Sequence, residues 1–268
     1  MFDYHMHSTF SPDSSLSMKD AIEQSISIGT KEICFTDHLD FDFDGKGHDI
    51  AFNYDYYLSV LNSYIEQYKD RITIKKGIEV GLQPHIIKEC KDYVANKDLD
   101  FIIGSIHSVN KEDLYSGNLF DNITQKEAYL KYFEELLYVI DNYDNYSVFG
   151  HLDMIKRYGG YDIILPLEDY KEVTITILKK LIEKGKGIEL NTSGIRYKLG
   201  DYHPSIDILK LYLEMGGEII TIGSDAHSKK HVGFELKNAA KHLKDMGFKY
   251  ITTFDKMIPK FNSIDSLF

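Results

Sequence analysis

Nine side chains with the chemistry of metal ligands are spread through the sequence, most of them at the end of a short apolar run. They are six of the chain's 11 histidines and three carboxylates. Histidine nitrogens combined with carboxylate oxygens bind Zn²⁺, Fe²⁺ and Mn²⁺. The candidate ligands are His5, His7, Asp13, His38, Glu79, His107, His151, Asp225 and His227.

The number of these candidates indicates more than one ion. One metal ion usually takes three or four protein ligands, so nine candidates with a carboxylate free to bridge predict two or three divalent ions. Clustered ions are the usual arrangement for in-line attack on phosphorus, because they stabilise both the attacking and the leaving oxygen. The residue types therefore predict a hydrolase that cleaves a phosphate ester.

Short strand-like runs alternate with longer amphipathic stretches along the chain. Helix starts are marked by Ser17 with Asp20 and by Thr124 with Glu127, which are typical of capping boxes. Repeated βα units predict a parallel sheet with right-handed crossovers. The predicted strands are residues 2–7, 32–36, 72–79, 101–107, 147–151, 187–191 and 219–225, and residues 249–254 form a short additional strand.

The polar residues decide between an open sheet and a barrel. The candidate ligands lie at the carboxyl ends of the predicted strands. In a parallel barrel these ends surround one axis on one face, where barrel enzymes keep their active sites, whereas an open sheet spreads them along a line. We therefore predict an α/β fold, a closed or nearly closed TIM-like (β/α) barrel, as one domain over residues 1–268.

Composition limits the partners. A net charge of −11 disfavours non-specific binding to nucleic acid or to a membrane surface. The two cysteines form no CxxC motif, the amino-terminal residues do not resemble a signal peptide, and no apolar run is long enough to span a bilayer. We expect a cytoplasmic protein whose partner is a small phosphate monoester, and the oligomeric state stays open.

An acidic stretch follows the second predicted strand. Residues 40–45 match the first half of a calcium-binding loop, but the twelfth position, where a bidentate glutamate is required, is Ala51. We interpret this stretch as a mobile acidic loop beside the site that suits a cationic substrate.

Taken as a set, the motifs resemble those of the PHP (polymerase and histidinol phosphatase) superfamily, and within it those of the histidinol-phosphatase family. The superfamily motifs are the HxH at residues 5–7, Thr36-Asp37-His38, Glu79, His107, His151 and Ser224-Asp225-Ala226-His227. The narrower resemblance lies in Ser11-Pro12-Asp13, His151-Leu152-Asp153, Asn191-Thr192-Ser193-Gly194 and Thr252-Thr253-Phe254.

This resemblance implies a distorted seven-stranded barrel that holds three divalent metal ions. Many relatives have histidine where this chain has Asp13. Carried over by position, the first ion is bound by His5, His7, Glu79 and Asp225, the second by Glu79, His107 and His151, and the third by Asp13, His38 and His227.

The resemblance also implies hydrolysis of L-histidinol phosphate to L-histidinol and phosphate, a step of histidine biosynthesis. Two of the three arginines, Arg157 and Arg196, follow the fifth and sixth predicted strands, and an arginine fork matches phosphate oxygens. Asn191 and His203 are further candidates for substrate binding. The catalytic candidates are Glu79, Asp225 and Asp153, the last as a proton donor for the leaving group.

Three alternatives remain open. Another phosphoesterase of the superfamily would act on nucleotides, nucleic-acid ends or phosphotyrosine. A metal-binding barrel without catalysis is disfavoured by the complete ligand set. An amidohydrolase-type deaminase shares the barrel and the ligand types, but usually relies on one or two ions.

Overall fold

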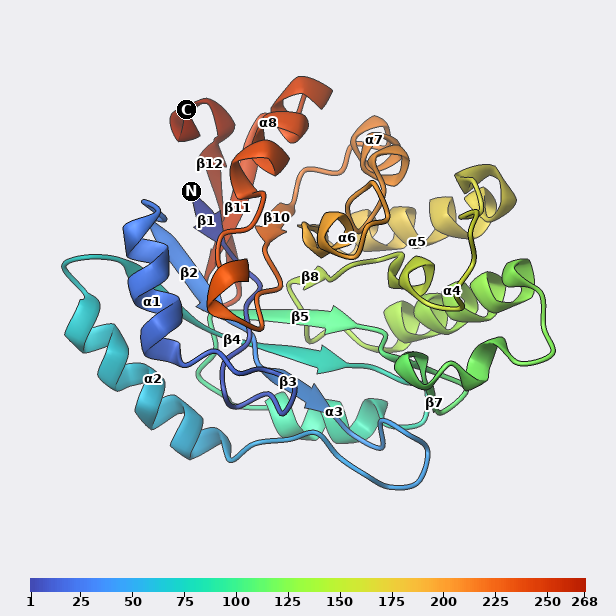
Figure 1. Cartoon of the computed structure of the whole chain (residues 1–268), viewed down its shortest axis with the longest axis horizontal. Coiled ribbons are helices and arrows are strands. Elements are labelled where there is room, and N and C mark those ends of the chain that lie inside the picture. Colours follow the sequence, from blue (N-terminus) through green and yellow to red (C-terminus); the bar gives the residue numbers. More distant parts are fainter.

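The computed structural model describes every residue from Met1 to Phe268, and its centre is a parallel sheet of seven strand positions (Figure 1). Strand β3 (His38–Asp40) continues β2 after a two-residue break and pairs with the second half of β4. The other strands follow in the order β1 (Phe2–Asp3), β2 (Glu32–Phe35), β4 (Thr73–Gly81), β5 (Phe101–Ser105), β8 (Val148–Phe149), β9 (Gly187–Asn191) and β10 (Ile220–Gly223), each parallel to its neighbours.

The first and the last of these strands meet. The Tyr4 N–H donates to the Ile222 carbonyl at 2.9 Å, and the Asp225 N–H donates to the His5 carbonyl at 2.8 Å. Beyond the strand ends, Met6 and Ala226 form an isolated parallel bridge. These contacts replace a regular ladder, so the sheet is a distorted, nearly closed barrel. The predicted TIM-like α/β barrel is confirmed.

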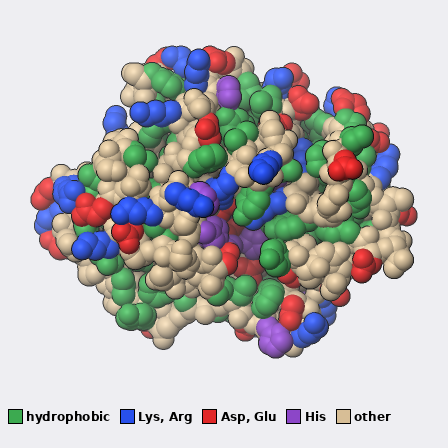
Figure 2. Space-filling model, in the orientation of Figure 1, with side chains coloured by type: hydrophobic (Ala, Val, Ile, Leu, Met, Phe, Trp, Pro, Cys, Tyr) green, Lys and Arg blue, Asp and Glu red, His purple; other side chains and the backbone are tan.

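Helices surround the barrel (Figure 1). Seen from the same direction, the molecular surface is hollowed near its centre (Figure 2). The Ser17 side chain accepts the Asp20 N–H as a helix cap, and Thr124 with Glu127 forms a complete capping box, as predicted. None of the helices has both the length and the apolarity needed to cross a bilayer. The helices are α1 (Met18–Ser27), α2 (Tyr54–Tyr68), α3 (Ile87–Val94), α4 (Gln125–Asn142), α5 (Lys171–Glu183), α6 (Ser193–Arg196), α7 (Ile206–Glu214) and α8 (Leu236–Met246).

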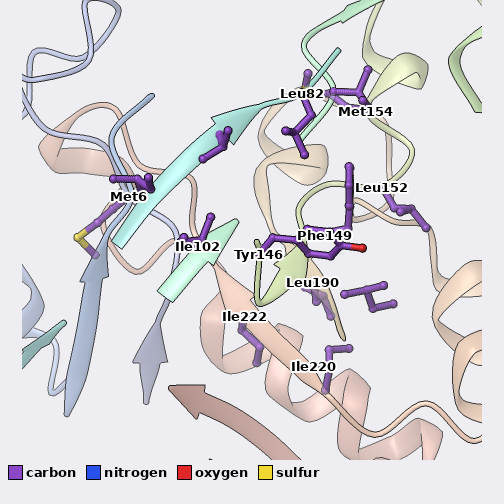
Figure 3. Close-up of a cluster of buried hydrophobic side chains, with 14 of the residues drawn as sticks. Met6, Leu82, Ile102, Tyr146, Phe149, Leu152, Met154, Leu190, Ile220 and Ile222 are labelled. Carbon is purple, nitrogen blue, oxygen red and sulfur yellow. The ribbon is translucent and has the colours of Figure 1, made fainter. Parts of the chain in front are cut away.

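The main core lies between the barrel and these helices (Figure 3). Strand β9 shows how the strands divide core from site. Ile188 and Leu190 belong to the core cluster, whereas Glu189 and Asn191 contact polar groups inside the barrel. Because side chains alternate along a strand, the same five residues supply both the packing that holds the barrel and the polar groups within it.

An antiparallel hairpin of β11 (Tyr250–Asp255) and β12 (Ile258–Ser263) covers the amino end of the barrel. Phe254 packs in a second apolar cluster with Tyr4 and Phe101, and its N–H donates to the Tyr4 hydroxyl at 2.8 Å. The predicted strand at residues 249–254 is confirmed as the first half of this hairpin. The remaining strands, β6 (Ser108–Val109) and β7 (Glu112–Asp113), form a small separate hairpin.

Several predicted strands extend too far at their carboxyl ends. Strand β5 ends at Ser105, β8 at Phe149 and β10 at Gly223, so that His107, His151 and Asp225 lie on irregular backbone. His151 has a φ of 23° and Asp225 a φ of 53°. Such left-handed values are uncommon in non-glycine residues and do not fit a strand. The first strand is likewise shorter than the predicted residues 2–7.

Candidate metal centre

A cavity of about 480 Å³ opens at the carboxyl end of the barrel. Histidine and acidic side chains gather in the hollow seen in Figure 2. His5 and His7 are fully buried behind the cavity wall. The other seven candidate ligands line the wall, namely Asp13, His38, Glu79, His107, His151, Asp225 and His227.

The first group of candidate ligands surrounds one point. Nε2 of His5 lies 3.0 Å from Nε2 of His7 and 3.2 Å from Oε2 of Glu79. Nε2 of His7 lies 3.5 Å from Oε2 of Glu79 and 3.5 Å from Oδ1 of Asp225. Tetrahedral bonds of ~2.0–2.1 Å to zinc place neighbouring ligand atoms about 3.3 Å apart. These four side chains have the spacing of a metal site.

The second group shares Glu79 with the first. Oε1 of Glu79 lies 2.8 Å from Nε2 of His151 and 3.3 Å from Nε2 of His107. The Ser105 hydroxyl also donates to Oε1 at 2.6 Å. The two oxygens of one carboxylate therefore face different sets of histidines, which is the geometry of a bridging ligand.

The third group lies nearest the cavity mouth. Nε2 of His227 lies 3.1 Å from Oδ2 of Asp13, and Nε2 of His38 lies 3.7 Å from the same oxygen. His38 is also close to the centre, because its Nδ1 lies 3.1 Å from Oε2 of Glu79. The structure thus connects Asp13 to two histidines, and His38 connects the third group to the other two.

The donor set fits divalent cations. Oε2 of Glu79 is buried and has no hydrogen-bond donor, although three histidine nitrogens lie within 3.5 Å of it. A buried carboxylate oxygen without a donor carries a large desolvation cost, which a shared cation offsets. Four overlapping triads of these side chains are close enough to hold an ion, and they cut across the three expected ligand sets: His7, His38 and His227; His5, His7 and Asp225; His5, Glu79 and His151; and His38, Glu79 and His107.

The buried candidate ligands shift one another's pKa values strongly. Burial alone would raise the pKa of Glu79, but His5, His107 and His38 outweigh it and hold this pKa well below its usual range. Burial would also raise the pKa of Asp225, and the neighbouring histidines, His5 foremost, lower it strongly. Burial together with His227 and His38 lowers the pKa of His7. Burial would lower the pKa values of His5, His38 and His107, but the neighbouring carboxylates outweigh it and raise them, so these histidines carry positive charge where a bound cation would otherwise lie.

Hydrogen bonds at the far ring nitrogen orient several of these histidines. An Nδ1–H that donates to an oxygen leaves the Nε2 lone pair free for a metal. Ser11 donates to Asp37 at 2.7 Å, so it accepts from His7. The acceptors are Glu189 for His5 at 2.7 Å, Ser11 for His7 at 3.1 Å, Asp40 for His107 at 2.6 Å and the Asp225 carbonyl for His227 at 3.0 Å.

Comparison with known families gives the context of this centre. The model of the PHP domain matches residues 3–193. The chain belongs to the PHP domain family. The predicted resemblance to this superfamily is confirmed.

The similar PHP proteins include histidinol-phosphatases. A histidinol-phosphatase of Lactococcus lactis is 34% identical over 95% of this chain and 94% of that protein. A probable histidinol-phosphatase of Clostridium acetobutylicum is 30% identical over 97% of this chain and 99% of that protein. The crystal structure of the L. lactis histidinol phosphate phosphatase, complexed with zinc, L-histidinol and phosphate, superposes with a TM-score of 0.90 at 32% identity, covering 97% and 98% of the two chains.

The two arginines expected at the substrate lie differently in this PHP domain. Arg157, in the 3-10 helix Met154–Arg157, lines the cavity, and its guanidinium lies 3.3 Å from the centre of the Tyr197 ring. Arg196 is not part of the cavity wall. It donates to the backbone carbonyls of Ser224 at 2.9 Å and Asp225 at 2.8 Å. Arg157 therefore faces the cavity, while Arg196 supports the loop that carries Asp225 and lies 4.0 Å from Oδ2 of that residue.

Asp153, expected as a proton donor, lies behind the cavity wall. It is fully buried, and its carboxylate binds Nδ1 of His203 at 2.9 Å, Nζ of Lys156 at 2.6 Å and the Ser205 N–H at 2.9 Å. Burial would raise its pKa, but Lys156 and His203 outweigh burial and lower it. A buried, ionised carboxylate is placed to hold the wall rather than to donate a proton.

Two expected substrate ligands are also turned away from the cavity. His203 is fully buried and is absent from the wall. Asn191 donates to Glu189 at 3.1 Å and accepts the Ser193 N–H at 2.9 Å, which uses both ends of its amide. Neither residue faces the space where a substrate would lie, because both bind neighbouring protein groups.

Residues 40–45 differ from the expected acidic loop. Asp40 ends β3 and supports His107, and Phe43 lines the cavity. Asp42 binds Nε2 of His85 at 2.8 Å, and Asp44 binds Nδ1 of His48 at 2.8 Å. The loop contributes one aromatic wall residue, whereas the carboxylates of Asp42 and Asp44 bind surface histidines.

Two supporting carboxylates were missed by sequence reasoning. Asp40 was assigned to the acidic loop, and Glu189 was not considered. The available signal was an acidic residue at an inward position of an otherwise apolar strand, as in the run Gly-Ile-Glu-Leu-Asn at residues 187–191. Such a residue is buried inside the barrel and requires a polar partner there.

Proposed function

We propose that the protein is a histidinol-phosphatase, a metal-dependent phosphomonoesterase that hydrolyses L-histidinol phosphate to L-histidinol and phosphate. The observation that carries this proposal is the convergence of nine candidate histidine and carboxylate ligands, seven of them in the wall of one cavity and two directly behind it. They converge in a chain that matches a histidinol-phosphatase over 95% of its length. The zinc, L-histidinol and phosphate in the similar L. lactis structure support the same metal and substrate here.

Three divalent ions, zinc, iron or manganese, fit the donor groups. When bound, such ions lower the pKa of water and neutralise charge on a phosphoryl group. We assign the first ion to His5, His7, Glu79 and Asp225, the second to Glu79, His107 and His151, and the third to Asp13, His38 and His227, on the pairwise distances between their ligand atoms.

The wall of the cavity supplies the remaining contacts. Arg157 would bind phosphate oxygens, which is supported by its place in the cavity wall and by the stacking on Tyr197 that orients its guanidinium. Phe43, Tyr115 and Asp113 also line the cavity. Aromatic faces and a carboxylate suit an alcohol that carries an imidazole and an amine, because they stack with a flat ring and attract positive charge.

The deciding experiment compares substrates on one preparation of known metal content. Phosphate release is measured for L-histidinol phosphate, a nucleoside monophosphate, phosphotyrosine and p-nitrophenyl phosphate, with the metal content determined on the same sample. We expect kcat/KM to be highest for L-histidinol phosphate. A higher value for another ester would place the protein elsewhere among PHP phosphoesterases. Ammonia release without phosphate would indicate a deaminase, and metal binding without turnover a non-catalytic barrel.

Histidine biosynthesis in the cytoplasm is the setting that this activity implies. Deletion of the coding sequence should make growth dependent on added histidine or histidinol, because histidinol is the product of the proposed reaction. Growth restored by histidine but not by histidinol would place the block at a different step.

A further inference from the structure

Glu189 is a carboxylate inside the barrel that the proposed ligand set does not use. It is fully buried on β9, and its one ion-pair partner within 4 Å is His5. Oε1 lies 2.7 Å from Nδ1 of His5, and Oε2 accepts the backbone N–H of His151 at 3.0 Å. The amide of Asn191 donates to Oε2 at 3.1 Å. Glu189 therefore contacts one ligand of the first ion and one of the second.

The neighbouring backbone leaves room for this carboxylate. A side chain at Gly223 would overlap both Oε1 of Glu189 and Cβ of His5. A Cβ at Gly150 would lie 3.3 Å from Oε2 of Glu189 and closer still to Ile103. Glycine at the end of β10 and directly after β8 thus leaves the space in which Glu189 reaches His5 and His151.

The chemistry of this contact sets the state of His5. With a metal ion at Nε2, the ring proton of His5 lies on Nδ1, where Oε1 of Glu189 is 2.7 Å away and accepts it. Nε2 then presents a lone pair toward His7 and Glu79, which lie 3.0 and 3.2 Å away. The second contact holds the backbone of His151, whose φ of 23° requires support from its surroundings.

We propose that Glu189 is a positioning residue that fixes the tautomer of His5 and the backbone of His151, and thereby sets the zinc affinity of the centre. This inference rests on the metal centre of the proposed function. It concerns zinc binding rather than the identity of the substrate.

The test is Glu189→Gln, which keeps the size of the side chain. If the glutamine side-chain oxygen accepts the backbone N–H of His151, the glutamine NH₂ group faces His5. That NH₂ group then requires Nδ1 of His5 to be an acceptor. The His5 proton then moves to Nε2 and blocks the metal. We expect zinc affinity, measured by competition with a chromophoric chelator, to fall roughly 10- to 100-fold. In ¹⁵N NMR of the zinc-loaded protein, the Nδ1–H signal of His5 should disappear.

Asp100→Asn is the matched control. Asp100 is also a buried carboxylate, and it accepts the backbone N–H groups of Lys76 at 3.0 Å and Lys256 at 3.1 Å near the start of β5. It contacts none of the assigned ligands, so this variant should keep wild-type zinc affinity. Equal weakening in both variants would overturn the proposal, because the effect would then follow any buried carboxylate.

Unchanged zinc affinity and an unchanged His5 signal in Glu189→Gln would also overturn it. If circular dichroism shows that this variant is unfolded, Glu189→Asp takes its place. The aspartate still accepts hydrogen bonds, but its shorter side chain does not reach both partners. The variant should therefore bind zinc more weakly than the wild type, and equal affinity would overturn the proposal. These measurements need no substrate, so failure to hydrolyse L-histidinol phosphate would refute the proposed function alone.

Discussion

Glu79 lies between His151 and His38 with one oxygen turned to each. Oε1 is 2.8 Å from Nε2 of His151, and Oε2 is 3.1 Å from Nδ1 of His38. Both oxygens are buried, and Oε2 has no hydrogen-bond donor. Glu79 therefore joins the first group to the second and reaches the third through His38, while His227 contacts the first group directly, with Nδ1 3.3 Å from Oδ1 of Asp225.

Removing this carboxylate should disable the centre. For Glu79→Gln we expect kcat to fall by about 1000-fold or more, since loss of a bridging ligand removes ~4 kcal/mol of transition-state stabilisation. The metal content, measured by mass spectrometry on the same sample, should fall below that of the wild type. Full activity with full metal content would contradict the assignment of Glu79 as a bridge.

The two arginines should show different defects. Arg157→Ala should lower kcat/KM by roughly 10- to 100-fold with little change in stability, because charged hydrogen bonds contribute ~1.5–3 kcal/mol. Arg196→Ala removes the donors to the Ser224 and Asp225 carbonyls, so we expect weaker zinc binding and a lower melting temperature. Steady-state kinetics and thermal melts on both variants separate the two roles. Identical profiles would contradict the assignment.

Removal of the ions should cost stability as well as activity. The candidate histidines and carboxylates are brought together only in the folded protein, so a cation that binds them stabilises the folded state. At zinc concentrations of 100 times Kd this linkage amounts to ~2.7 kcal/mol. We expect a chelator to lower the melting temperature and abolish turnover, and added zinc to restore both. Calcium, which prefers oxygen ligands, should not replace it. An unchanged melting temperature after complete metal removal would argue against these sites.

Asp153→Asn tests whether Asp153 supports the wall or donates a proton. The variant leaves Lys156 buried without its charged partner 2.6 Å away, and breaking a buried pair costs ~3–5 kcal/mol. We expect the free energy of unfolding in urea to drop by about 3 kcal/mol. The exposed pair of Asp207 with Lys210 offers the control, and Asp207→Asn should change stability by less than ~1 kcal/mol. Wild-type stability with lost turnover would instead favour the proton donor.

The thiols should be inert in the native protein. Cys34 and Cys90 are fully buried. Burial raises the pKa of Cys34 well above its usual value and that of Cys90 to about 12. Thiolate, the reactive form, is then scarce and shielded. A disulfide exchange reagent should label no thiol in the folded protein and two after denaturation. Fast labelling under native conditions would show that one of these sites opens.

Local patterns predicted the barrel and the candidate ligands that the structure brings together at its carboxyl end. Alternation within short apolar runs places His5 and His7 on one face, and Thr124 with Glu127 marks a helix start that the structure confirms. These signals are short-range, because strand periodicity and helix caps depend on residues within a few positions of one another. The bounds of the strands were less predictable, since the left-handed backbone at His151 and Asp225 depends on contacts with other strands.

The sequence by itself determined an alternating βα chain whose metal-type ligands follow its strands. Tertiary structure alone decided that Arg157 faces the cavity while Arg196 binds backbone carbonyls, and that Glu189 supports His5 across a separation of 184 residues. The physical reason is that side-chain direction beyond a strand end follows from how distant segments pack once the barrel closes. Neither the residue type nor its spacing along the chain carries that information.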